Sequence, residues 1–130
     1  MSLYKIFVLF MIVLFSSPLV AFTITQDKVF QEIYKNPQNQ NKKILMIYTA
    51  NNCPQCAYMK EKIFKEKEVF GYMSKHFVVI EKNTSTDELP EGFSYFGIPT
   101  MFIIDSKGNT IDTIVGSARA KDFLEMIKKY

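Results

Sequence analysis

Two cysteines separated by only two residues constrain this chain more than any other feature. Cys53 and Cys56 are the only cysteines, and they follow closely after five apolar residues at positions 44–48. Such a run, bounded by polar residues, is typical of a strand that is covered on both faces of a parallel sheet. Pro54 suits the first position of a following helix, where its missing N–H group costs nothing. We therefore predict a strand, a turn and a helix capped by Cys53.

The start of a helix also determines what the two sulfur atoms can do. Unpaired backbone N–H groups and a partial positive charge at the helix N-terminus favour the thiolate of Cys53. A thiolate is the attacking species in disulfide exchange, and Cys56 is placed to resolve the mixed disulfide that results. The spacing thus favours a redox-active pair in which Cys53 and Cys56 are the catalytic residues.

Two other uses of the cysteine pair remain open from the residues alone. A tetrahedral zinc site needs four ligands, but the chain has no second cysteine pair, and its one histidine, His76, lies far along the sequence. An inert structural disulfide would close a very small ring and would stabilise the fold little. Disulfide exchange is favoured over both alternatives, and we predict no metal site and no cofactor.

Hydrophobic periodicity and turn residues predict the other elements. In the first half these are a helix with Thr25 as N-cap that ends at Asn36, a polar loop at 38–43, the strand at 44–48, and a helix from Cys53 that breaks or bends before Val69. In the second half they are a buried strand at 77–80, a polar loop at 84–91, a single helical turn at 93–96, strands at 100–105 and 110–115, and a helix at 118–129.

The order of these elements predicts an α/β fold. Two strands that are joined through a helix run parallel, whereas two strands joined by a tight turn run antiparallel. The turn at 106–109 contains Gly108, which suits a position of positive φ in a hairpin. We therefore expect a mixed central sheet with helices on both faces.

The first residues differ from the rest of the chain. Lys5 is followed by an unbroken apolar run at 6–15, then by Pro18 and the small residue Ala21. This layout is typical of a secretory signal peptide at 1–21, which would leave a single domain at 22–130. An uncleaved anchor is the main alternative, although Pro18 interrupts a segment that would need about 20 apolar residues to span a membrane. Either way, the domain is expected outside the cytoplasm, where disulfides persist.

The charge balance bears on possible partners. The chain carries 16 basic and 13 acidic side chains, with a formal net charge of +3. This charge is too small, and its lysines are too evenly spread, for the concentrated positive face that nucleic-acid binding requires. We expect no nucleic-acid partner.

Three ordered motifs resemble those of the thioredoxin superfamily. They are Cys53-Pro54-Gln55-Cys56 at a strand-to-helix junction, Gly97-Ile98-Pro99-Thr100 before a strand, and Val115-Gly116 before the last helix. The resemblance extends from about Thr25 to Tyr130 and implies a thioredoxin fold. Within the superfamily, the CPQC sequence and the lysine- and glutamate-rich helix after it look most like the exported bacterial SoxW-like proteins.

The resemblance also implies roles for individual residues. Pro99 is expected to be cis and to face the cysteine pair, with the backbone of Ile98 pairing with an extended substrate segment. Pro54 and Gln55 form the active-site spacer. Ile47, six residues before Cys53, stands where thioredoxin carries a buried acid for proton transfer, which leaves the source of that proton transfer open.

Two further side chains have ordinary structural explanations. Lys60 lies one turn after Cys56 and is expected to be a solvated lysine on a helix. His76 is expected to end a helix rather than to carry protons.

Size suggests a role within the superfamily. Only 42 residues lie between Cys56 and Pro99, which leaves no room for the helical insert of DsbA-like oxidases. We expect a monomeric periplasmic reductase or electron carrier that acts on disulfides of exported proteins. A membrane electron-transfer reductase of the Dsb type would keep it reduced. The alternative is a non-enzymatic binding module or a copper(I) carrier that uses both thiolates.

Overall fold

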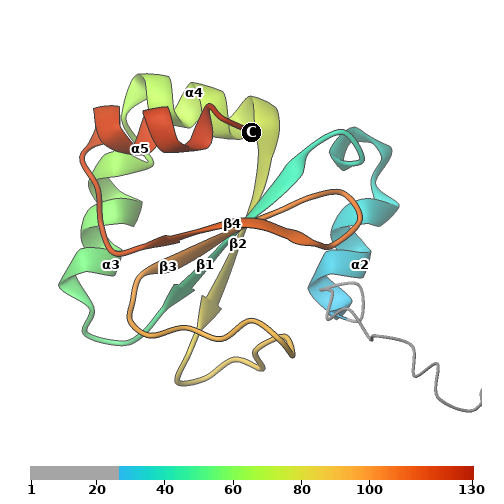
Figure 1. Cartoon of the computed structure of the whole chain (residues 1–130), viewed down its shortest axis with the longest axis horizontal. Helices are drawn as coiled ribbons and strands as arrows, with labels where there is room; N and C mark the ends of the chain where they lie inside the picture. Colours follow the sequence, from blue (N-terminus) through green and yellow to red (C-terminus); the bar gives the residue numbers. More distant parts are fainter. Residues whose placement is uncertain (1–26) are drawn as a thin grey trace, which may run out of the picture.

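The computed structural model describes residues 27–130 and contains one four-stranded sheet in the order β2-β1-β3-β4 (Figure 1). The strands are β1 (Lys43–Thr49), β2 (Phe77–Asn83), β3 (Thr100–Ile104) and β4 (Thr110–Val115). β1 and β2 are parallel, whereas β3 is antiparallel to both β1 and β4. The predicted mixed sheet is therefore confirmed. The predicted signal or anchor at 1–21 lies outside the described residues.

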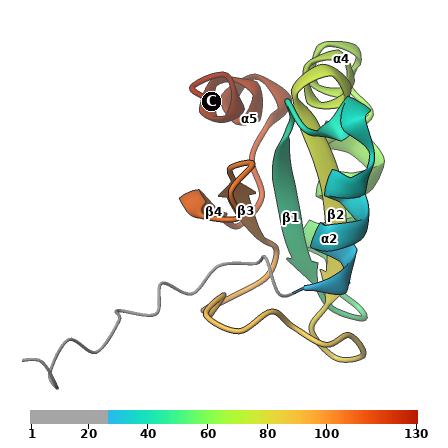
Figure 2. The same ribbon diagram turned by 90° about the vertical axis from the view of Figure 1, so that its right-hand side faces the viewer.

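Helices cover both faces of the sheet, as predicted. They are α2 (Lys28–Lys35), the 3-10 turn η3 (Pro37–Asn39), α3 (Pro54–Tyr58), the π-helical turn η4 (Met59–Ile63), α4 (Lys67–His76) and α5 (Ala120–Ile127). Figures 1 and 2 show α2 alone on one face and α3, α4 and α5 on the other. None of the helices among the described residues is long and apolar enough to span a membrane.

Alternation along β1 builds a separate apolar core on each face of the sheet. Leu45 and Ile47 pack toward α4 and α5 in one core, while Ile44, Met46 and Tyr48 pack toward α2 in the other. All five side chains are buried because β1 is a central strand with helices above and below it. The C-terminal end of this rigid strand carries the loop that leads to the cysteines.

The first helix begins later than the sequence suggested. Its N-cap is Asp27 rather than Thr25, because the carboxylate of Asp27 accepts a hydrogen bond of 3.1 Å from the N–H of Phe30. The end at Asn36 is as predicted, since Asn36 is the C-cap. The segment predicted as a loop at 38–43 is only partly irregular. Its first two residues belong to η3, and its last residue, Lys43, belongs to β1.

Two predictions in the middle of the chain were wrong. The strand predicted as buried, β2, lies at the edge of the sheet among residues 27–130, and it is only partly buried, since Val79 is 45% exposed. Residues 93–96 do not form a helical turn. Instead, Phe93 is anchored in the core beside α2 while Phe96 is fully exposed, so tertiary burial of one aromatic ring shapes this segment.

The C-terminal elements follow the predicted order. Gly108 has φ of 87° in the turn between β3 and β4, a conformation that favours glycine. The last helix is shorter than the predicted 118–129, because it begins at Ala120 after Arg119 as N-cap. Its predicted inner residues, Phe123, Leu124 and Ile127, are buried.

Candidate active site

The cysteine pair lies at the junction between β1 and α3, as the sequence predicted. β1 ends at Thr49, and the chain then turns through Asn52, whose φ of 56° is left-handed. Asparagine adopts this conformation more readily than most residues. Cys53 is the N-cap of α3 and Pro54 occupies its first turn.

The two sulfur atoms differ in environment. Cys53 and Cys56 form a disulfide, and the backbone N–H of Cys56 donates a hydrogen bond of 3.1 Å to the Sγ of Cys53. Cys56 is 3% exposed, whereas Cys53 is partly exposed. The N–H group at the helix start therefore reaches the more accessible of the two sulfur atoms, that of Cys53.

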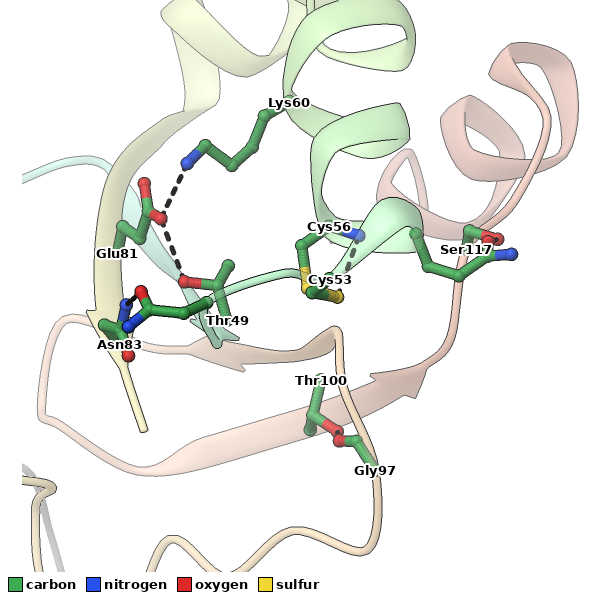
Figure 3. Close-up of a disulfide and its surroundings, with 11 residues drawn as sticks. Thr49, Cys53, Cys56, Lys60, Glu81, Asn83, Gly97, Thr100 and Ser117 are labelled. Atoms are coloured by element: carbon green, nitrogen blue, oxygen red, sulfur yellow. Dashed lines mark hydrogen bonds and ion pairs between the residues drawn. A yellow bond between two sulfur atoms is a disulfide. The ribbon is translucent and has the colours of Figure 1, made fainter. Parts of the chain in front are cut away.

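The loop before β3 contains the predicted cis peptide bond. The bond between Ile98 and Pro99 is cis, which confirms that expectation. The carbonyl of Pro99 accepts a hydrogen bond of 2.8 Å from the N–H of Gly116, and the hydroxyl of Thr100 donates one of 2.6 Å to the carbonyl of Gly97. Figure 3 shows Gly97 and Thr100 below the cysteine pair. The first bond holds the loop to the residue that follows β4, and the second lies within the loop and the first residue of β3.

The spacer residue Gln55 has a partner far away in the sequence. The hydroxyl of Ser117, just before α5, donates a hydrogen bond to its side-chain oxygen. In the same region the N–H of Ala118 donates to the Sδ of Met59 at 3.4 Å. Figure 3 shows Ser117 on one side of the cysteine pair, opposite Glu81. The start of α3 is thus tied to the segment that precedes α5.

The position six residues before Cys53 is apolar in the structure as well. Ile47 is 1% exposed and belongs to the core beside α4 and α5. Its neighbour in the parallel register of β2 is Glu81. An acidic side chain therefore lies one strand away from Ile47, at the same level of the sheet.

Glu81 is part of a polar network that sequence reasoning missed. One carboxylate oxygen, Oε1, accepts a hydrogen bond of 2.9 Å from the hydroxyl of Thr49 and forms an ion pair of 2.7 Å with the ammonium group of Lys60. Lys60 is thus an ion-pair partner and not only a solvated lysine. The available signal was the parallel pairing of β1 with β2, which places position 81 beside position 47 once the register is known.

This network and both cysteines border one cavity. The cavity has a volume of about 580 Å³ and is open to solvent. Its lining residues are Thr49, Ala50, Asn51, Asn52, Cys53, Pro54, Cys56, Ala57, Lys60, Glu61, Glu81 and Asn83. Figure 3 shows Thr49, Lys60 and Glu81 together on one side of the cysteine pair.

Other polar groups lie apart from this cavity. His76 is the last residue of α4, where its ring stacks on Tyr72 with centroids 4.2 Å apart, as expected for a residue that ends a helix. Tyr48 lies in the core beside α2, where burial, with smaller contributions from Asp27 and Tyr95, raises its pKa to about 12.

Comparison with known proteins identifies the family. The model of the thioredoxin-like domain family matches residues 30–130. The chain belongs to this family. Thioredoxin H5 of Arabidopsis thaliana is 30% identical over 95 residues, which are 71% of this chain and 75% of that protein. The narrower assignment to the SoxW-like group stays a prediction.

Solved structures share the thioredoxin fold. A thioredoxin from Thermus thermophilus has a TM-score of 0.64 and 20% identity, covering 76% of this chain and 81% of that one. The C-terminal domain of DsbD from Neisseria meningitidis, in its oxidised form, has a TM-score of 0.59 and 22% identity, covering 77% and 87%. The periplasmic thioredoxin SoxS from Paracoccus pantotrophus has a TM-score of 0.56 and 15% identity, covering 68% and 94%.

Family and geometry together establish the class of reaction. This thioredoxin-like protein is a thiol-disulfide oxidoreductase with a CxxC pair at the start of a helix. Interconversion of the dithiol and the disulfide carries two electrons, and the structure shows the disulfide form.

Proposed function

We propose that this protein is a periplasmic reductase or electron carrier that acts on disulfides of exported proteins. The observation that carries the proposal is the asymmetry of the cysteine pair. Cys53 is partly exposed, and its Sγ accepts a hydrogen bond from the N–H of Cys56, whereas Cys56 itself is buried. An accessible sulfur suits attack on a substrate, and a buried neighbouring sulfur suits resolution.

The reaction proceeds in two exchanges. The thiolate of Cys53 attacks one sulfur of a substrate disulfide, forms a mixed disulfide and releases the first substrate thiolate. Cys56, as thiolate, then attacks the Sγ of Cys53, which forms the Cys53–Cys56 disulfide and releases the second substrate thiolate. Two electrons pass from the cysteine pair to the substrate, and each released thiolate takes up a proton.

The loop before β3 is the proposed substrate-positioning element. We propose that the backbone of Ile98, next to Pro99, pairs with an extended segment of the substrate, as the family resemblance implies. Pro54 and Gln55 are the proposed spacer, and the hydrogen bond from Ser117 restrains Gln55.

The small size of the domain supports a reductase or carrier role. Within the chain, the 42 residues between Cys56 and Pro99 are used by the end of α3, by η4, α4 and β2, and by the segments that connect them, which leaves no inserted helical subdomain. The fold neighbours include the C-terminal domain of DsbD, which is consistent with electron supply by a Dsb-type membrane reductase. We propose that the protein acts as a monomer.

The proposed location outside the cytoplasm has two supports. One is the basic residue, apolar run and small residue at positions 1–21, which have the pattern of a signal peptide. The other is the shared fold with SoxS, which is described as a periplasmic thioredoxin. Both supports agree with the persistence of disulfide substrates outside the cytoplasm.

A trapping experiment tests role and location together. The variant Cys56→Ser should accumulate mixed disulfides with exported proteins and with a membrane reductant, because Cys53 can attack but the bond cannot be resolved. The soluble adducts should be released by osmotic shock and should disappear from gels when dithiothreitol is added. The matched variant Cys53→Ser should trap nothing.

Several outcomes would count against the proposal. Trapping by Cys53→Ser alone would reverse the roles of the two sulfurs. Adducts found only in the cytoplasmic fraction would contradict the location. If neither variant traps a partner and the purified wild type does not reduce insulin with dithiothreitol, a binding module becomes the better explanation.

A further inference from the structure

We propose that Glu81 accepts the proton of Cys56 in the second exchange, and that Thr49 and Lys60 are its positioning residues. The inference deepens the proposed function and rests on it, because it assigns a role within the same reaction. Its basis is the location of the Glu81 carboxylate, which borders the same cavity as both cysteines and is held there by two partners.

Burial of Cys56 creates the need for a proton acceptor. The residue is 3% exposed, so the thiol has little direct access to bulk water. Only a thiolate attacks a disulfide efficiently, so the proton must leave as the attack begins. The cavity that borders Cys56 is open to solvent and, at about 580 Å³, has room for water, which gives the proton a route out.

Two carboxylates border this cavity, and only one of them is fixed in place. The carboxylate of Glu81 accepts a hydrogen bond of 2.9 Å from the hydroxyl of Thr49 and one of 2.7 Å from the ammonium group of Lys60. Glu61 borders the cavity from η4, but its side chain has no hydrogen-bond or ion-pair partner among residues 27–130. A fixed acceptor is more effective than a mobile one because proton transfer requires hydrogen-bond geometry.

The two positioning residues hold Glu81 from different elements. Thr49 is the last residue of β1 and is 3% exposed, so its hydroxyl is rigidly placed between the sheet and the cysteine loop. Lys60 reaches over from η4, and Figure 3 shows both groups meeting the carboxylate beside the cysteines. The carboxylate is thus held on the cysteine side of β2.

The proposed step balances in atoms and charge. The S–H bond of Cys56 breaks, its proton passes through water in the cavity to a carboxylate oxygen of Glu81, and its electron pair attacks the Sγ of Cys53. The bond between Cys53 and the substrate sulfur breaks, and the substrate leaves as a thiolate. The proton on Glu81 then passes to solvent or to the departing thiolate, which restores the carboxylate.

The charged groups around Glu81 come from two elements. Lys60 and Glu61 border the cavity from η4, and the ammonium of Lys60 is the cation that pairs with Glu81. The next residue on β2, Lys82, points away and pairs with Asp27 at 3.1 Å on the other face of the sheet. The adjacent cysteines are the remaining ionisable groups that border the cavity.

Stopped-flow kinetics separates the two exchanges. The reduced wild-type protein, mixed with excess dithiobis(nitrobenzoate), should release one coloured thiolate in a phase that depends on probe concentration and another in a phase that does not. The second phase reports attack by Cys56. In Glu81→Gln it should slow by about 100-fold, the lower end of what positioned acid–base groups contribute.

The pH dependence adds a readout that a structural role would not change. With Glu81 present, the second phase should be nearly flat between about pH 6 and 8, where a glutamate is ionised and a thiol is mostly protonated. In Glu81→Gln it should rise by about tenfold per pH unit, because attack then depends on the small fraction of free thiolate.

Matched variants control for charge and shape. Glu61→Gln removes the same charge from the same cavity and should leave both phases within about twofold of wild type. Thr49→Val should slow the second phase by about tenfold, as expected for the loss of one hydrogen bond that orients the acceptor, and Thr49→Ser should restore it. Circular dichroism confirms that each variant is folded.

The outcomes distinguish this inference from the proposed function. A wild type that releases thiolate in both phases, with a Glu81→Gln variant that has the same second phase and the same flat pH profile, overturns the role of Glu81 and leaves the proposed function standing. Equal slowing in Glu61→Gln also overturns it, because general charge would then be the cause. A wild type that shows neither phase contradicts the proposed function itself.

Discussion

Two neighbouring residues of β2 form ion pairs on opposite faces of the sheet, in very different surroundings. Glu81 pairs with Lys60 beside the cysteines, where both side chains are 42% exposed. Lys82 pairs with Asp27 beside α2, where the side chains are only 10% and 12% exposed. The alternation of a strand sends adjacent residues to opposite faces, so one step along the chain separates the two environments.

The difference in exposure suggests different uses for the two pairs. A pair near water contributes little to stability but can exchange protons with solvent. A pair shielded from water is costly to break, because the remaining charge is left without compensation. We therefore infer that the pair of Asp27 and Lys82 holds α2 on the sheet, while the pair of Lys60 and Glu81 is available for chemistry.

The largest expected effect on stability comes from breaking the shielded pair. Lys82→Met should lower the free energy of unfolding by about 3 kcal/mol, since it leaves the carboxylate of Asp27 without its cation in a largely buried position. Urea titration followed by circular dichroism measures the change. The double variant with Asp27→Asn should recover part of the loss. If Lys82→Met lowers the free energy of unfolding no more than Lys60→Gln does, the two pairs do not differ as proposed.

A smaller effect is expected at Tyr48, in the same core as α2. Its hydroxyl is buried without a hydrogen-bond partner among the described residues, so Tyr48→Phe should leave stability at pH 7 unchanged or raise it by up to about 1 kcal/mol. Burial raises the pKa of Tyr48 from 10.0 to about 12. The stability that depends on a neutral Tyr48 is therefore fully present below pH 10. The free energy of unfolding then falls as the pH rises from 10 toward 12, because the phenol loses its proton more easily in the unfolded chain.

Alkaline unfolding gives the test at Tyr48. Stability measured across this pH range should fall less in Tyr48→Phe than in the wild type. Some decline should remain, because burial and Asp105 also raise the pKa of Tyr34. Parallel pH profiles of the two proteins would show that Tyr48 does not contribute to the alkaline loss.

The smallest expected effect is at the exposed pair. Lys60→Gln should change the free energy of unfolding by no more than about 0.5 kcal/mol, because solvent screens a pair of this exposure. The same urea titration at low and high salt should detect little difference between variant and wild type. If Lys60→Gln lowered the free energy of unfolding as much as Lys82→Met does, the proposed difference between the exposed and the shielded ion pair would be wrong.

Local features of the fold were predictable because their causes are local. The cap formed by Cys53, the place of Pro54 in the first turn and the turn at Gly108 depend on a few consecutive residues. The apolar stripe of α5 depends on helical spacing alone, and its predicted residues are buried. In contrast, Phe96 was placed in a helical turn because nearby spacing could not reveal that Phe93 is held in the core.

The residues of the candidate active site also fall into two groups, those that the sequence predicted and those that tertiary packing brought together. The sequence by itself predicted the roles of Cys53 and Cys56, because a short motif marks them, and it showed that Ile47 is not an acid. The resemblance to the thioredoxin superfamily predicted the cis bond before Pro99, which the structure contains. Only the tertiary structure brought Thr49, Lys60 and Glu81 together, from β1, η4 and β2. Their proximity depends on the register between two parallel strands and on the path of a helix over them, and such long-range packing leaves no mark in the spacing of residues along the chain.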